Sequence, residues 1–129
     1  MEKEKAIEEE QRNMVQERLD AIERFYGTVP FITKVISEEP ELFIAHSDFS
    51  KNLMQEPKHL DLKTLELASI AAGSALGAEF CLDIHLRQAR KHGATDGEIF
   101  EAIMAGTYMA MTNGQARALR RFKEMDKKS

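Results

Sequence analysis

The chain has 129 residues, 43% of them hydrophobic and 31% charged, a balance typical of one globular domain rather than of a disordered protein. Its 18 basic and 22 acidic residues give a net charge of −4, so we expect neither nucleic acid nor an acidic membrane as a partner. The single cysteine excludes an internal disulfide framework and suits a reducing cytoplasm, where we expect the protein to reside. The start of the chain is not that of a signal peptide, and its uncharged runs are too short to span a membrane.

The spacing of apolar residues predicts an all-α fold, a compact helical domain covering residues 1–129, because strand-like alternation is absent. In the N-terminal part, over residues 5–54, we expect three helices, at about 5–26, 30–36 and 41–54. Gly27 and Pro40 are the residues predicted to end the first two helices.

The second half contains no proline and can support longer helices. Asp61 is the predicted N-cap of a helix that ends near Gly77, and the next helix runs to Gly93. We expect these two helices to form a central antiparallel hairpin, with its turn at Gly77.

The last part of the chain is predicted to hold two helices. Thr95 and Glu98 have the spacing of a capping box, which begins a helix through Met111. Asn113 or Gly114 is expected to end it, and a final helix follows to about residue 125. The basic residues of that final helix indicate a solvated face or an interface with acidic residues rather than a nucleic-acid site; they are Arg117, Arg120, Arg121 and Lys123.

Small residues recur four apart at Gly73 and Gly77, and at Gly106, Ala110 and Gly114. Such rows allow helix backbones to approach closely. They indicate tight packing within the domain or packing against another subunit.

Cys81 and His85 carry the chemistry that the sequence suggests. Four residues apart on a helix, they share one face, and Cys81 falls in the first turn, where the helix dipole favours a thiolate. A neighbouring imidazole can take the thiol proton. Glu66, on the preceding helix of the hairpin, is a candidate to orient His85. The alternatives are a buried structural cysteine, which is common, and a metal site, for which these three residues make a poor ligand set, so we expect none.

Three stretches then resemble the carboxymuconolactone decarboxylase family, which includes the alkylhydroperoxidase D-like proteins. They lie at residues 62–67, 78–85 and 89–99, within a family-like core of about residues 60–122. The resemblance implies an all-helical fold and assembly with itself, as a homotrimer or a homohexamer.

In the alkylhydroperoxidase D-like branch, a glutamate and a histidine relay protons to a reactive cysteine, and another cysteine resolves the oxidised form. The resemblance places these catalytic roles on Glu66, His85 and Cys81, but the resolving position falls on Ala78. It therefore implies a protein that reduces hydroperoxides without a cofactor and is reduced again by an external thiol.

Two alternatives stay open. A decarboxylase-like lyase would use His85 as acid and base on a carboxylated substrate, with Glu66 or Glu79 orienting it. A basic anchor for that substrate would come from Lys63, Arg87 or Arg90. The other alternative is a non-catalytic helical oligomer that binds a partner or a small molecule, with an adaptable pocket lined by Met104, Met109 and Met111.

Overall fold

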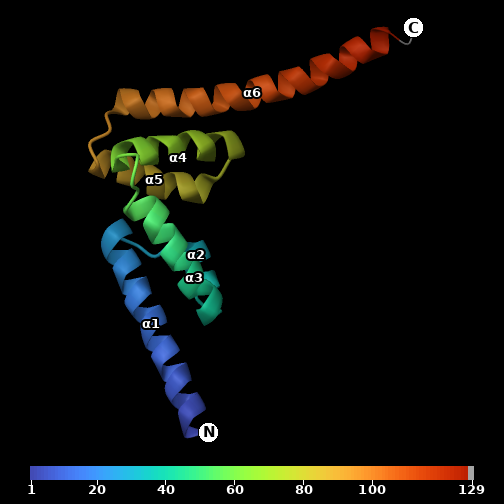
Figure 1. Ribbon diagram of the computed structural model, residues 1–129. Helices are drawn as coiled ribbons and strands as arrows, with labels where there is room; N and C mark the ends of the chain where they lie inside the picture. The colour runs from blue at the N-terminus through green and yellow to red at the C-terminus, as the bar shows by residue number, and fades with distance from the viewer. Residues whose placement is uncertain (128–129) are drawn as a thin grey trace. The chain divides into compact units, whose positions relative to one another are not determined.

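A computed structural model describes residues 1–127, and these residues contain helices and no strand, which confirms the all-α fold class. The helices are α1 (Glu2–Tyr26), α2 (Phe31–Ile36), α3 (Pro40–Ser50), the π-helical turn η1 (Lys51–Gln55), α4 (Leu62–Leu76), α5 (Glu79–Lys91) and α6 (Asp96–Asp126) (Figure 1). Contacts divide the chain into two compact units, residues 1–59 and residues 60–129. One domain over residues 1–129 stays a prediction. Within residues 1–127, every helix is too short or too polar to cross a membrane.

In the N-terminal unit the helices fall close to their predicted bounds. Gly27, at φ 80°, ends α1 in the left-handed conformation that glycine adopts without strain. Pro40 is the first residue of α3, where its missing N–H costs nothing. The predicted helix through residue 54 has a different form: its last turn widens into η1.

An arginine joins the two longest helices of this unit. Arg18 of α1 donates hydrogen bonds to the Ser47 hydroxyl at 2.9 Å and to the Ile44 carbonyl at 3.3 Å, and it also pairs with the Asp48 carboxylate. On α3, the fully buried residue Phe43 provides apolar packing. Through Nη1, the guanidinium fixes α3 against α1.

In the C-terminal unit, α4 and α5 form the predicted antiparallel hairpin. The Thr64 N–H donates to Asp61 Oδ1 at 2.7 Å, which confirms Asp61 as the N-cap of α4. Gly77, at φ 69°, makes the turn, and α5 begins directly after Ala78. The core centres on Ile70, Ala89 and Ile99, one residue from each of α4, α5 and α6.

Helix α6 runs unbroken from Asp96 to Asp126, so the prediction of a break at Asn113 or Gly114 is wrong. The predicted capping box is confirmed: Glu98 N–H donates to Thr95 Oγ1 at 3.1 Å, and Thr95 N–H to Glu98 Oε1 at 3.0 Å. One glycine inside a helix costs only about 1 kcal/mol, and helix propagation through the good helix formers beyond it outweighs that cost.

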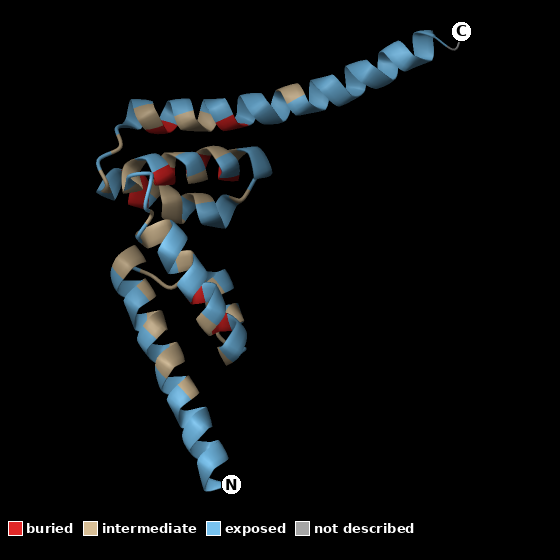
Figure 2. Ribbon diagram, viewed as in Figure 1, coloured by how far each residue is buried: buried red, intermediate tan, exposed pale blue. Residues whose placement is uncertain are grey.

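Only the first half of α6 is packed within this unit. Its buried residues are Ile99 and Gly106, and none is buried between Gly106 and Asp126. Figure 2 shows the same division: α6 is buried where it lies along α4 and exposed where it continues past α4.

Gly106 marks the closest approach of α6 to α4. A Cβ atom at this position would lie 2.0 Å from the carbonyl oxygen of Ala71, a backbone atom. At Gly106, the small residue therefore allows α6 to pack closely on α4 within the same unit. Gly114 differs, because a Cβ atom there would meet nothing within 4 Å.

We predict opposite effects of alanine at these two glycines. Gly106→Ala should lower the free energy of unfolding by about 1–3 kcal/mol, because α6 must move away from α4. Gly114→Ala, the matched control, should raise it by about 0.5–1 kcal/mol, because alanine loses less backbone entropy in a helix. Urea unfolding followed by circular dichroism measures both. Equal effects of the two substitutions would contradict the close approach at Gly106.

Candidate active site

The hairpin brings Glu66 and His85 together. Glu66 lies on α4 and its side chain is 0% exposed, while the His85 side chain on α5 is 20% exposed. Glu66 Oε2 lies 2.5 Å from His85 Nδ1, a hydrogen bond between residues 19 positions apart. The expectation that Glu66 reaches His85 across the hairpin is met in this geometry, whereas the catalytic roles of both residues stay predictions.

This contact fixes which ring nitrogen is available for chemistry. A carboxylate only accepts hydrogen bonds, so Nδ1 of His85 is the donor to Glu66. In the neutral imidazole, Nε2 then carries the lone pair and can accept a proton. The carboxylate thus orients the ring and stabilises it when Nε2 is protonated, the role that an acidic partner has in catalytic histidine pairs.

The buried carboxylate of Glu66 depends on His85 for hydrogen bonding, because its second oxygen has no partner among the described residues. Glu66 Oε1 is buried and accepts no hydrogen bond from a described residue. A buried carboxylate is costly unless it is paired. The bond to His85 is therefore the contact that keeps this charged group tolerable inside the hairpin.

Cys81 lies one turn before His85, and its side chain is exposed. This exposure excludes the alternative of a buried structural cysteine. Cys81 is the third residue of α5, within the first turn, as predicted. No hydrogen bond joins its sulfur to His85 in the described part of the chain, although both residues lie on α5, four positions apart.

The other residues considered for the site lie elsewhere. Glu79 is exposed, and it is Glu66 that orients His85. Within residues 1–127, no group of three or more His, Cys, Asp or Glu side chains could hold a metal ion. Ala78, at the N-cap position of α5, offers no side-chain hydrogen bond to the helix.

Two of the basic residues considered as a substrate anchor are paired with carboxylates at the start of α6. Lys63 Nζ lies 2.8 Å from Glu98 Oε2, and Arg90 lies 3.3 Å from Asp96. The Lys63–Glu98 pair could not be predicted from the sequence, because it joins residues far apart in the chain. Lys63, together with the Thr95 N–H, lowers the pKa of Glu98 from 4.5 to about 2, and Glu98 in turn raises the pKa of Lys63.

These features define a class: an all-helical protein with a buried carboxylate–imidazole pair beside an exposed thiol. The chain belongs to the carboxymuconolactone decarboxylase family, whose sequence pattern it matches over residues 40–124. The match is wider than the predicted core of 60–122, because it also includes α3 and η1. A comparison with curated proteins found no match, and neither did one with solved structures.

Removal of the Lys63 charge should raise the pKa of Glu98. In Lys63→Met, the carboxylate loses its largest stabilising contact but keeps its bond from the Thr95 N–H, so its pKa should rise from about 2 without passing 4.5. Since the folded pKa is depressed, Glu98 contributes stability that is present above about pH 4.5 and lost as the pH falls toward 2. Carboxyl ¹³C chemical shifts measured against pH test this, and an unchanged Glu98 titration would show that Lys63 is not the cause.

Breaking the Glu66–His85 pair from one side should cost more than replacing both members. We expect His85→Ala to lower the free energy of unfolding by about 3 kcal/mol, because it leaves a buried carboxylate without a hydrogen bond. The double variant Glu66→Leu, His85→Ala should recover part of that loss, since no buried charge is then left. Chemical unfolding of both variants provides the comparison. A double variant less stable than His85→Ala would contradict the pairing.

Proposed function

We propose that the protein is a thiol-dependent peroxide reductase, in which Cys81 is the nucleophile and the Glu66–His85 pair moves protons. The observation that carries the proposal is the combination of an exposed sulfur with an imidazole one turn away, whose Nδ1 is held by a buried carboxylate. Family membership is consistent with this role and does not by itself specify it.

The first half of the reaction oxidises Cys81 and reduces the hydroperoxide. His85 Nε2 takes the thiol proton, through a bridging water because no direct hydrogen bond joins the two residues. The thiolate attacks the terminal oxygen of ROOH, the O–O bond breaks, and the alkoxide takes the proton back from Nε2. The products are Cys81–SOH and ROH.

The second half needs an external thiol, because these 129 residues contain no other cysteine. One thiol R′SH condenses with Cys81–SOH to give a mixed disulfide and water. A second R′SH attacks that disulfide, releases R′SSR′ and restores Cys81–SH. The alanine at position 78, before α5, is the reason that the cycle uses two external thiols.

The test removes the base while it keeps the fold. In His85→Asn the amide can still donate to Glu66, but it has no nitrogen that accepts a proton. Oxidation of Cys81 by tert-butyl hydroperoxide should slow at least about 100-fold, as measured by trapping the sulfenic acid with dimedone and mass spectrometry. Cys81→Ser should abolish peroxide consumption, and His46→Asn, an exposed histidine of α3, should leave the rate unchanged. A rate that is the same in His85→Asn and the unsubstituted protein would overturn the proposed relay.

A second candidate is cofactor-free decarboxylation of a carboxylated lactone. The observation in its favour is that the Glu66–His85 pair is complete without Cys81. Carbon dioxide would leave with its bonding electrons kept on the substrate, and protonated His85 would supply a proton to the carbanion.

The two candidates differ in their demand on Cys81. Under decarboxylation, Cys81→Ser should release carbon dioxide from carboxymuconolactone as fast as the unsubstituted protein, while His85→Asn should be inactive. Absence of turnover by the unsubstituted protein would rule out this candidate. If the protein neither consumed peroxide nor released carbon dioxide from the lactone, the result would favour a non-catalytic binding protein.

A further inference from the structure

The N-terminal unit contains a cleft of about 270 Å³ between α1 and α3. Its walls come from three segments of that unit: the second half of α1, the last turn of α3 and the π-helical turn η1. A cleft of this size lies close to the lower limit of ligand pockets, about 300 Å³, and therefore suits a small metabolite rather than a large cofactor. Its lining includes none of the residues proposed for catalysis.

Arg18 lines this cleft, and one edge of its guanidinium is unused. All three contacts of Arg18 with α3, to Ile44, Ser47 and Asp48, are made by the single nitrogen Nη1. Among residues 1–127, no acceptor is bound to Nε or Nη2. These two nitrogens share one edge of the planar group, and their parallel N–H bonds can bind both oxygens of a carboxylate. The contacts with α3 thus hold the guanidinium in place and leave a two-donor edge for a ligand.

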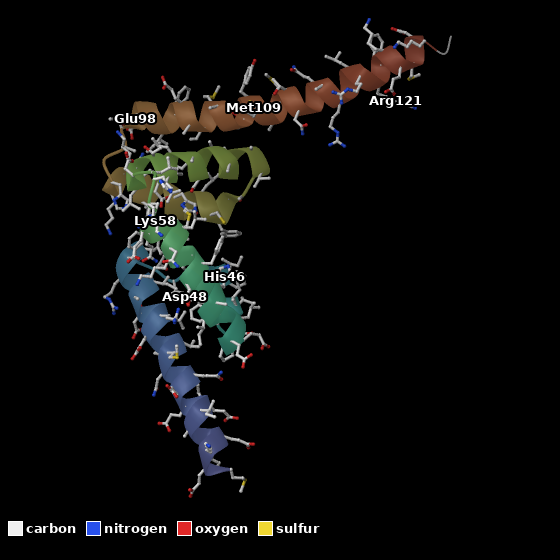
Figure 3. The ribbon with its side chains drawn as sticks, viewed as in Figure 1. His46, Asp48, Lys58, Glu98, Met109 and Arg121 are labelled. Atoms are coloured by element: carbon white, nitrogen blue, oxygen red, sulfur yellow. The ribbon has the colours of Figure 1, made fainter. Side chains whose placement is uncertain are left out.

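The charges that line the cleft balance one another. Arg18 and Lys51 are basic, and Glu17 and Asp48 are acidic. Asp48, labelled in Figure 3, lies on the side of α3 that contacts α1 and is paired with Arg18, whereas Glu17 has no ion pair within residues 1–127. The two carboxylates would repel a simple anion, but a zwitterion can pair with both signs of charge. The lining therefore favours a ligand that carries a carboxylate and an ammonium group.

One part of the lining is apolar. Ala21 and Ile22 of α1 contribute hydrocarbon surface, while Ser50 and Gln55 add neutral polar groups from α3 and η1. Ligand pockets commonly combine apolar walls with a few polar groups that fix the orientation of the ligand. A small amino acid with an apolar side chain matches both the charges and this apolar surface.

The turn η1 is a second indication that this region has a function. It continues α3 in π-helical form and contributes Lys51 and Gln55 to the lining. Single π-helical turns are rare and occur frequently at functional sites. The family pattern begins at residue 40, so it includes α3 and η1 but not α1. The cleft thus needs a helix that the family match does not cover, and family membership does not imply it.

We propose that the cleft between α1 and α3 binds a small amino acid with an apolar side chain. The carboxylate of the ligand binds the Nε–Nη2 edge of Arg18, and its ammonium group pairs with Glu17. Its side chain contacts Ala21 and Ile22. This inference does not depend on the proposed chemistry at Cys81.

Titration of the ¹⁵N-labelled 129-residue chain with L-leucine tests the proposal by NMR. Amide signals of residues 17–22 and 47–55 should shift and saturate, with a Kd of about 1 mM or tighter. Two truncated probes, 4-methylpentanoate without the ammonium group and 3-methylbutylamine without the carboxylate, should each bind at least about 10-fold more weakly. The absence of saturable shifts with both L-leucine and L-phenylalanine would overturn the proposal. Binding of either truncated probe as tightly as L-leucine would also overturn it.

Two substitutions test the assigned residues. Ala21→Leu should weaken L-leucine binding at least about 10-fold, because the larger side chain fills the cleft, whereas Ala6→Leu, the matched control at an exposed position of α1, should leave the Kd unchanged. Arg18→Lys keeps the charge but loses the two-donor edge, so it should weaken binding by a similar factor. Circular dichroism checks that each variant is folded, and Ala21→Leu decides alone if Arg18→Lys is not. An unchanged Kd in a folded Ala21→Leu or Arg18→Lys variant would contradict the proposal.

Discussion

The hydrogen bond between Glu66 and His85 is the contact on which the site depends. It pairs a carboxylate that is fully buried inside the hairpin, and it leaves Nε2 as the ring nitrogen that can accept a proton. The turn at Gly77 and the cap at Asp61 support the same contact, because they help to hold α4 and α5 in the antiparallel arrangement that this bond needs.

The start of α5 joins the fold to the proposed chemistry. The helix begins immediately after the Gly77 turn, so Cys81 falls in the first turn, close to the N–H groups that lack a partner within the helix, and its side chain is exposed. An alanine at position 78 leaves this sulfur without a partner thiol in the chain. In the proposed cycle, an external thiol therefore reduces the oxidised sulfur.

Local signals in the sequence were sufficient to predict many of the helix caps and turns in this structure. Asp61, Gly77 and the Thr95–Glu98 capping box act through neighbours three or four residues away, so their effects could be predicted correctly. The expectation at Gly114 was wrong because a local weakness was weighed without the cooperativity of the helix around it. The Lys63–Glu98 pair and the close approach of α6 to α4 at Gly106 depend on how helices pack, and no spacing along the chain encodes them.

Most of the unbroken helix α6 is unusually poor in charged residues. Between Ile99 and Arg117, the helix has a single charged residue, Glu101, although charged residues make up 31% of the chain. A surface helix with one neighbour can carry charge over most of its circumference. Helix α6 packs on α4 along its first half, and the surface that it leaves exposed there is instead neutral and largely apolar.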